Sequence, residues 1–143
     1  MSTWKTVLVG VDGSRGSRKA LTWAAAEAAG HGAELVVVNV WERAVPPAAG
    51  SGSPPLGDVP DASHDATESL VRIIKEELGE SPAVQAQARV KHGRPAEVLI
   101  EESAGADLLV VGTRGHGGFA GLLLGSVSQH VAAYAQCPVT VVR

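Results

Sequence analysis

Hydrophobic and polar positions form blocks along the chain, and the blocks predict five strands. Each strand segment is a short apolar run, which is typical of a strand buried on both faces of a sheet. The predicted strands are Thr6–Val11, Glu34–Trp41, Val84–Lys91, Asp107–Val111 and Pro138–Val142. Polar residues interrupt the third run more often than the others, which indicates a strand nearer an edge of the sheet.

Four helices are predicted between these strands, because apolar residues there recur at spacings of three and four. The apolar stripe of the first helix is Leu21, Ala24, Ala25 and Ala28, and that of the second is Ala66, Leu70, Ile73, Ile74 and Leu78. Glycines follow both stripes and end both helices. Pro95 opens a third, short helix in its first turn, where a missing N–H costs nothing. A fourth helix runs from about Ser126 to Gln136.

Strands that alternate with helices predict a parallel sheet with right-handed crossovers and helices on both faces. The 143 residues fit one domain of the usual ~100–200 residues, so we expect a single open, doubly wound α/β sheet. Such sheets bind ligands outside the carboxyl ends of their strands, where the strand order reverses. Three segments are therefore candidates for the ligand site: Gly10-Val11-Asp12, Val40-Trp41-Glu42 and the chain from Gly112 onward.

Composition narrows the class of protein further. Apolar residues make up 45% and charged residues 19%, as in soluble globular proteins. A net charge of −3 argues against binding to nucleic acid or anionic membranes. No apolar run approaches the ~20 residues that span a bilayer, and the first residues lack the apolar region of a signal peptide. With a single cysteine, Cys137, and histidines without ligand-like spacing, we expect a cytoplasmic protein without disulfides or a protein-held metal.

Residues 42–61 interrupt the alternation with five of the chain's eight prolines. A loop of this length in a compact domain is usually functional or disordered. Because it follows the second strand, it lies on the edge of the sheet where a ligand is expected. A lid over that ligand and plain mobility both remain open.

A glycine-rich segment from Gly112 to Ser126 has the features of a phosphate-binding loop. It holds six glycines in fifteen residues, which permit close approach of the backbone to a ligand and expose successive N–H groups to an anion. Ser126, three residues before Gln129, fits a capping box and is the expected N-cap of a helix whose free N–H groups add a second anion site. A Walker A loop is excluded because no Gly-Lys-Ser/Thr occurs, and Gly115–Ala120 fits a dinucleotide fingerprint only weakly. The remaining prediction is a site for a mononucleotide or a similar phosphoester.

The spacing Gly112-x2-Gly115-x9-Gly125-Ser126 resembles the ATP-binding signature G-2x-G-9x-G-(S/T) of the universal stress protein family. The segments 7–14, 92–95 and 137–143 are also similar to that family. The resemblance covers essentially the whole chain. It implies one universal stress protein domain over residues 1–143, with strand order 3-2-1-4-5 and a Rossmann-like fold related to the adenine-nucleotide alpha hydrolases.

The resemblance also implies a role for each residue of an adenine-nucleotide site. Asp12 would contact the nucleoside beside the backbone of Gly10 and Val11, and the backbone of Val40 would read the adenine edge. The expected ribose and phosphate cradle is Gly112, Thr113, Arg114, Gly115, His116, Gly117, Gly118, Gly125, Ser126, Val127 and Ser128. The implied ligand is ATP, with Mg²⁺ held by its phosphates.

A homodimer is expected through the strand Pro138–Val142. Members of the family commonly pair through their last strand, and this one is apolar, with few charges to protect its edge. The resemblance gives no regulatory protein partner, so that partner stays unknown.

Several alternatives stay open beside these roles. Asp12 could instead cap the first helix, and His116 could be a solvated loop tip rather than a cation on the phosphates. The main functional prediction is an ATP-binding regulatory module of the stress response, and its rival is a slow ATPase or self-phosphorylating enzyme. The loop offers Arg114 but no lysine, and no acidic residue that would orient water, so turnover is expected to be weak at most and no catalytic residue is assigned. A flavodoxin-like electron carrier is disfavoured by the few aromatic residues.

Overall fold

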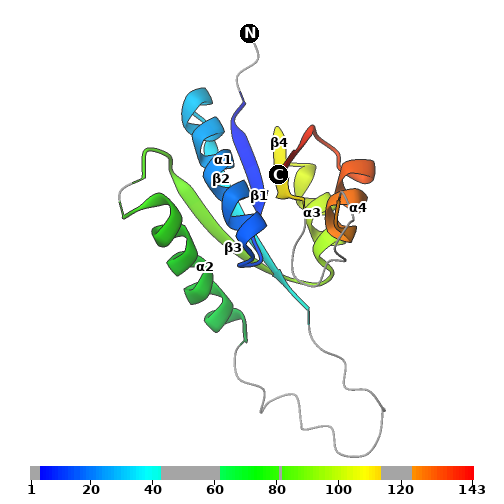
Figure 1. The fold of residues 1–143 in the computed structure, drawn as a ribbon, viewed down its shortest axis with the longest axis horizontal. Helices are drawn as coiled ribbons and strands as arrows, with labels where there is room; N and C mark the ends of the chain where they lie inside the picture. The colour runs from blue at the N-terminus through cyan, green and yellow to red at the C-terminus, as the bar shows by residue number, and fades with distance from the viewer. Residues whose placement is uncertain (1–3, 43–61, 81, 114–123) are drawn as a thin grey trace, which may run out of the picture.

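The computed structural model describes residues 4–42, 62–80, 82–113 and 124–143. The strands are β1 (Thr6–Gly10), β2 (Glu34–Trp41), β3 (Ala86–His92), β4 (Leu108–Gly112) and β5 (Val139–Val142). The helices are α1 (Arg15–His31), α2 (Ala62–Leu78), α3 (Pro95–Ser103) and α4 (Ser126–Tyr134). All pairs of neighbouring strands are parallel, and their order is β3-β2-β1-β4-β5. The predicted single-domain, doubly wound α/β sheet and its strand order are therefore confirmed (Figure 1).

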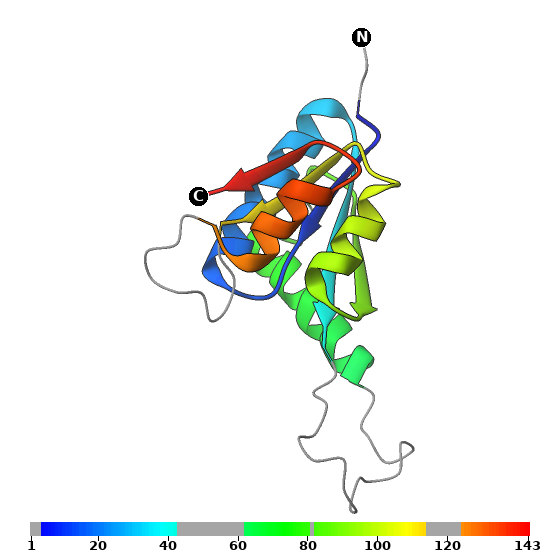
Figure 2. The ribbon, with the colours of Figure 1, turned by 90° about the vertical axis from the view of Figure 1, so that its right-hand side faces the viewer.

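Helices cover both faces of the sheet. Helices α1 and α2 lie on one face and α3 and α4 on the other (Figures 1 and 2). Alternate strand residues serve the two faces: Val7 and Val37 pack toward α1 and α2, whereas Leu8 and Val38 pack toward α3 and α4. The central strands β1 and β4 are buried on both faces, which explains why they read as continuous apolar runs.

The predicted apolar stripe of α1 is fully confirmed. Leu21, Ala24, Ala25 and Ala28 are all buried, and Gly32 ends the helix with φ 64°, a left-handed conformation that suits glycine. The third strand does lie at an edge, as expected. The fourth helix ends at Tyr134 and not at Gln136, because the chain already turns extended at Ala135 to enter β5.

Asp107 fastens β4 to the start of β1. Its Oδ2 accepts hydrogen bonds from the backbone N–H groups of Lys5 at 2.8 Å and Thr6 at 2.9 Å. Its own N–H donates to the carbonyl of Thr6 at 2.9 Å. The bond from Lys5 N–H, and next the bond from Thr6 N–H, lower the pKa of Asp107 from its ordinary value, and the charge of Lys5 acts in the same direction.

Two glycines at the carboxyl ends of the central strands let helices approach closely. A Cβ on Gly112 would lie 2.8 Å from both the carbonyl carbon and the oxygen of Gly16, in the first turn of α1. A Cβ on Gly10 would lie 2.9 Å from Cδ1 of Leu99 on α3. The flexible end of Leu99 can yield, but the backbone of Gly16 cannot. The glycine at 112 is thus required by packing, whatever else it does.

The stability of the protein should depend on pH through Asp107. A carboxyl whose pKa is lowered by folding stabilises the folded state above its unfolded pKa of about 4, and the contribution is lost as the pH falls through the lower folded pKa. Chemical unfolding between mildly acidic and strongly acidic pH should therefore show a shallower pH dependence for Asp107→Asn than for the parent. Glu80→Gln, at an exposed position, is the control and should keep the parent slope. Parallel profiles for the parent and Asp107→Asn would contradict this role.

Alanine at position 112 should destabilise the protein by about 1–3 kcal/mol, the usual cost of overpacking a tight contact. The matched control is Gly30→Ala, because Gly30 lies inside α1 with nothing within 4 Å of the added Cβ. That change should stabilise the protein by roughly 0.5–1 kcal/mol through helix propensity. Urea unfolding of the two variants measures both effects. Equal stability of the two variants would rule out the close contact between α1 and β4.

Candidate functional site

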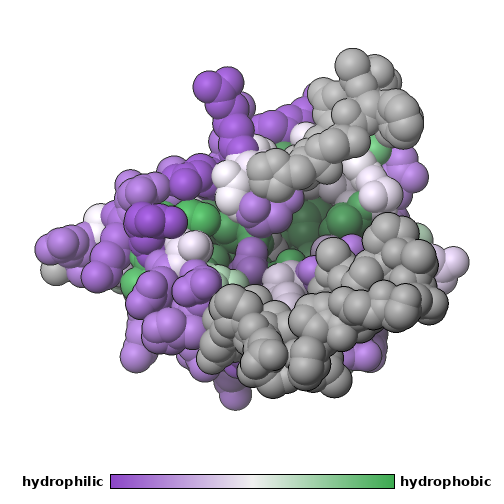
Figure 3. All heavy atoms as spheres, turned by 90° about the horizontal axis from the view of Figure 1, so that it is seen from below, coloured by the Kyte–Doolittle hydropathy of each residue, from purple (hydrophilic) through white to green (hydrophobic). Residues whose placement is uncertain are grey.

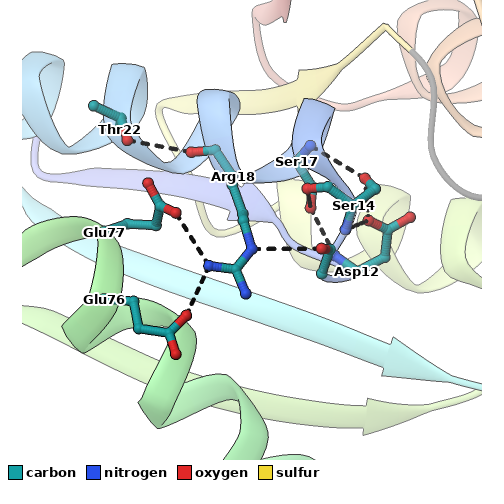
Figure 4. A network of polar contacts seen from close by, with 8 residues as sticks. Asp12, Ser14, Ser17, Arg18, Thr22, Glu76 and Glu77 are labelled. Atoms are coloured by element: carbon teal, nitrogen blue, oxygen red, sulfur yellow. Dashed lines mark hydrogen bonds and ion pairs between the residues drawn. The ribbon is translucent and has the colours of Figure 1, made fainter.

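The turn between β1 and α1 is held by a network of short polar bonds (Figure 4). Asp12 Oδ1 accepts from the N–H of Ser14 at 2.9 Å and from its hydroxyl at 2.5 Å. The side chain of Ser14 in turn accepts from Ser17 N–H, which makes Ser14 the N-cap of α1. Asp12 therefore does not cap the helix itself, and that alternative is wrong. It shapes the turn, and its exposed carboxyl group lies at the carboxyl edge of the sheet.

The backbone of Val40 points toward the end of β1. Even-numbered residues of β2 bond toward β1: Glu34 N–H donates to the carbonyl of Lys5, just before β1, and Val38 O accepts from Val11 N–H. Odd-numbered residues bond toward β3: Leu35 N–H donates to Gln85 O, and Trp41 O accepts from Gly93 N–H. Peptide groups of a strand alternate in direction, so the even-numbered residues of β2 face β1. Gly10 is the last residue of β1 that pairs with β2, opposite Val38. The N–H and C=O of Val40 therefore face the space that β1 has left.

Asn39 and the end of β1 define one wall of this space. The side-chain amide of Asn39 donates to the carbonyl of Val11 at 2.8 Å, and Val11 N–H donates to Val38 O at 2.9 Å. The two bonds hold Val11 against β2 while the chain turns away toward Asp12. Viewed from below, hydrophobic residues gather in a hollow of the surface (Figure 3), on the side toward which β2 and β3 run in Figure 1.

The end of β4 lies on the other side of β1 from β2 and is tied to α4. The hydroxyl of the buried Ser128 is 2.5 Å from the carbonyl oxygen of Gly112 and 3.0 Å from that of Thr113. Gly125 N–H donates to Thr113 O at 2.5 Å. These bonds close the base of the glycine-rich segment and set the first turn of α4 beside the end of β4. The side chain of Ser128 thus serves the framework.

The N-terminus of α4 differs from the prediction in its cap. Gly125 is the N-cap, without a side-chain hydrogen bond, so the prediction that Ser126 caps the helix is wrong. The extended backbone at Gly125 makes Ser126 the first helical residue, and the amide of Gln129 reaches back to Leu124 O at 3.1 Å rather than to a serine cap. Helix geometry leaves the N–H groups of Ser126, Val127 and Ser128 without an acceptor in the helix, and the first helical bond is from Gln129 to Gly125.

The structure brings part of the predicted site together. The residues at the ends of β1, β2 and β4 and at the start of α4 are Gly10, Val11, Asp12, Val40, Gly112, Thr113, Gly125, Ser126, Val127 and Ser128. Arg114, Gly115, His116, Gly117 and Gly118 lie outside the described residues, as does the segment 43–61. The predicted ligand-binding roles of both groups of residues stay predictions.

Three residues of the framework were not predicted from the sequence. Ser14 and Ser17 could have been found from the Asp-Gly-Ser-x-x-Ser pattern at 12–17, because serine is a favoured N-cap. Asn39 carries a signal too, since an amide inside an apolar strand needs a partner for its donors. The partner itself, Val11 O, depends on the tertiary structure.

Other chemistry is sparse in the described part of the chain. No three His, Cys, Asp or Glu side chains there come together as a metal site requires. Burial, and next the charge of Asp107, raise the pKa of Cys137, which disfavours a reactive thiolate. None of the described helices is long and apolar enough to cross a bilayer.

Comparison with known proteins identifies the family of this chain. The model of the universal stress protein family matches residues 3–143. A universal stress protein of Thermus aquaticus is 39% identical over 142 residues, which cover 98% of this chain and 99% of the relative. One from Mycolicibacterium smegmatis is 39% identical over 141 residues, covering 96% of this chain but 45% of the relative. The chain thus spans about half the length of several curated relatives that it matches.

Solved structures share the fold. The universal stress protein UspA of Lactobacillus plantarum superposes with a TM-score of 0.81 at 23% identity, covering all of both chains. A universal stress protein in complex with cAMP gives a TM-score of 0.72 at 28% identity, covering 99% of this chain and 98% of the other. A family protein from Arabidopsis thaliana with AMP bound gives 0.60 at 23% identity, covering 96% and 90%. From the family model and the similarity to the Thermus protein, this chain belongs to the universal stress protein family.

Proposed function

We propose that this protein binds an adenine nucleotide, ATP with Mg²⁺ on its phosphates, and acts as a nucleotide-dependent regulatory module. The observation that carries the proposal is the Val40 peptide, whose N–H and C=O face the end of β1 and have no backbone partner among the residues that the structure describes. One N–H and one C=O of a single residue offer a donor and an acceptor side by side. Adenine presents the complementary pair, an acceptor at N1 and a donor at N6. In the same placement guanine presents the reverse pattern.

The opposite end of the site suits the phosphates. The N–H groups of Ser126, Val127 and Ser128 have no helical acceptor, and the positive end of the helix dipole adds to their attraction for an anion. Asp12 lies between the two ends, fixed by Ser14 through Oδ1, and is assigned to the ribose. The glycine-rich segment, with Arg114 and His116, would complete the cradle. A divalent cation would then be held by the phosphates themselves.

Relatives support the nucleotide class rather than a particular nucleotide. The protein crystallised with cAMP, at 28% identity, carries an adenine nucleotide on the same fold. ATP, and a cytoplasmic location, rest on the sequence predictions. We assign no catalytic residue. A nucleotide that binds without turnover changes the surface presented to a partner, which is the mode of action proposed here.

We further propose a homodimer formed by β5. This strand lies at the edge of the sheet, and all four of its residues are half-buried. Leu109 N–H bonds to Pro138 O and Thr113 N–H to Val142 O, so alternation turns the peptide groups of Val139 and Val141 away from β4. An unprotected apolar edge of this kind is normally covered in a native protein. Antiparallel pairing with a second copy would cover it.

The nucleotide proposal is tested by calorimetric titration of folded variants. Gly125→Glu places a negative charge at a buried position where the phosphates meet the helix, and should weaken ATP binding at least about tenfold. Gly30→Glu, at an exposed helical position, is the matched control and should bind as the parent does. Ser126→Ala should weaken ATP binding only several-fold. The parent should bind GTP about tenfold more weakly than ATP, since about 1.4 kcal/mol of hydrogen bonding is lost.

The nucleoside end is tested separately with Asp12→Asn. The amide oxygen of asparagine can still accept from Ser14, so the turn is kept while the charge is removed. ATP should bind more weakly to this variant, whereas inorganic triphosphate should bind as it does to the parent. If Gly125→Glu keeps both its circular dichroism and the parent affinity for ATP, the cradle is misplaced and the proposal fails.

The dimer is tested by Val141→Pro. Proline removes an N–H that points away from β4, so the sheet within one copy keeps its bonds while the pairing between copies loses one. Thr140→Pro is the contrasting variant, because the peptide group of Thr140 faces β4, and it should destabilise the fold. Sedimentation at micromolar concentration should give a dimer for the parent and a folded monomer for Val141→Pro. A parent that sediments as a monomer would contradict the proposal.

A further inference from the structure

A pocket lies beside α1 and borders the turn that follows β1 at Gly13. It is a largely open depression with a volume of about 680 Å³ that reaches from α1 to the end of β5. This volume falls in the usual range of about 300–1,000 Å³ for small-molecule sites. Its walls include Arg15, Lys19, Trp23 and Val142. None of the described residues assigned to the nucleotide lines it.

Positive charge is concentrated in this pocket although the whole chain carries −3. Arg15 and Lys19 lie four residues apart and so on the same face of α1. Neither of them is within ion-pair distance of a carboxylate among the residues that the structure describes. The one carboxylate side chain among the described residues of the lining, Glu77, pairs with Arg18. Arg15 and Lys19 therefore remain without an anionic partner there, which favours an anionic ligand.

Arg18, also in the wall, is engaged elsewhere. Its Nη1 lies 2.9 Å from Glu76 Oε2 and 3.1 Å from Glu77 Oε1 on α2 (Figure 4). Its Nε–H points to the carbonyl of Gly13 at 3.5 Å. The hydrogen bond to Glu76, followed by that to Glu77, raises the pKa of Arg18. Arg18 therefore fixes the α2 side of the pocket, and Arg15 and Lys19 are the cations available to a ligand.

The pocket also has an apolar wall. Trp23 and Val142 are partly buried and pack against the core cluster under α1. Trp23 follows Lys19 by one helical turn, which is about 6 Å along the helix axis at 1.5 Å per residue. The apolar ring of Trp23 thus lies one helical turn from the cationic side chain of Lys19, a separation that a ligand with one ring system can span.

We propose that this pocket binds a small organic anion with a planar apolar body. The ring of the ligand packs on Trp23 and Val142, and its carboxylate or phosphate accepts charge-assisted hydrogen bonds from Lys19 and Arg15. This proposal does not rest on the nucleotide proposal, because no described residue assigned to the nucleotide lines the pocket.

The probe for this site is 2-naphthoate, with the uncharged 2-naphthalenemethanol as its matched analogue. Nuclear magnetic resonance of the indole N–H groups separates Trp23 from Trp4 and Trp41, with Trp23→Phe giving the assignment. Titration with 2-naphthoate should shift the Trp23 signal and reach saturation. Lys19→Gln and Arg15→Gln should each weaken binding about threefold to tenfold, as should loss of the charge on the probe. Lys75→Gln, an exposed change on α2, should leave binding unchanged.

Three outcomes would overturn the proposal. A shift of the Trp41 signal alone, abolished by saturating ATP, would place the probe at the carboxyl edge of the sheet. Equal affinity of the parent and the Arg15→Gln/Lys19→Gln double variant would reduce the pocket to an apolar patch without anion recognition. No shift of Trp23 at millimolar probe would show that the pocket binds no such anion. If ATP fails to bind while Trp23 still shifts, the nucleotide proposal fails and this one stands.

Discussion

The arrangement at the carboxyl edge depends on β1 leaving the sheet before its neighbours. Gly10 is the last residue of β1 that pairs with β2, opposite Val38, whereas β2 continues to Trp41. The chain turns out of the sheet through the bonds that Asp12, Ser14 and Ser17 make with one another. A central strand that ends early leaves a notch in the sheet, and on one side of it the Val40 peptide has no backbone partner in the described part of the chain. The start of α4 and the base of the glycine-rich segment lie on the other side.

Glycine at 112 links this notch to the helix layer. Because the strand end has no side chain there, the first turn of α1 approaches the backbone of β4 at Gly16. The turn at Asp12 is thereby held from two sides, by the sheet through Asn39 and Val11 and by the helix through its contact with β4. A rigid turn is what a site needs to hold a polar side chain in place without cost when a ligand arrives.

The fold could be predicted from the sequence because its signals are local. The apolar runs gave strand boundaries within two residues of those observed, and the alanine stripe of α1 was buried as expected. The cap of α4 was not predictable in the same way, because Ser126 and Gly125 are both acceptable N-caps and the bond from Gly125 N–H to Thr113 O decides between them. The bond between Asn39 and Val11 and the pocket beside Trp23 likewise bring together residues from different elements. Periodicity along one segment carries no information about such contacts.

The small residues under α1 have a consequence for how this protein can change. Ala20, Ala24 and Ala28 are fully buried against the sheet, so the spacing between helix and sheet is set by methyl groups. A larger side chain at any of them would push α1 away from the sheet, because there is no gap for it to fill. The Asp12 turn and Trp23 would move with the helix. The α2 layer, with Ile73, Ile74 and Leu78 only partly buried, can exchange one aliphatic residue for another. Sequence drift should therefore be uneven across one face of the same sheet: tightly limited under α1, and wider under α2 except at the buried Leu70.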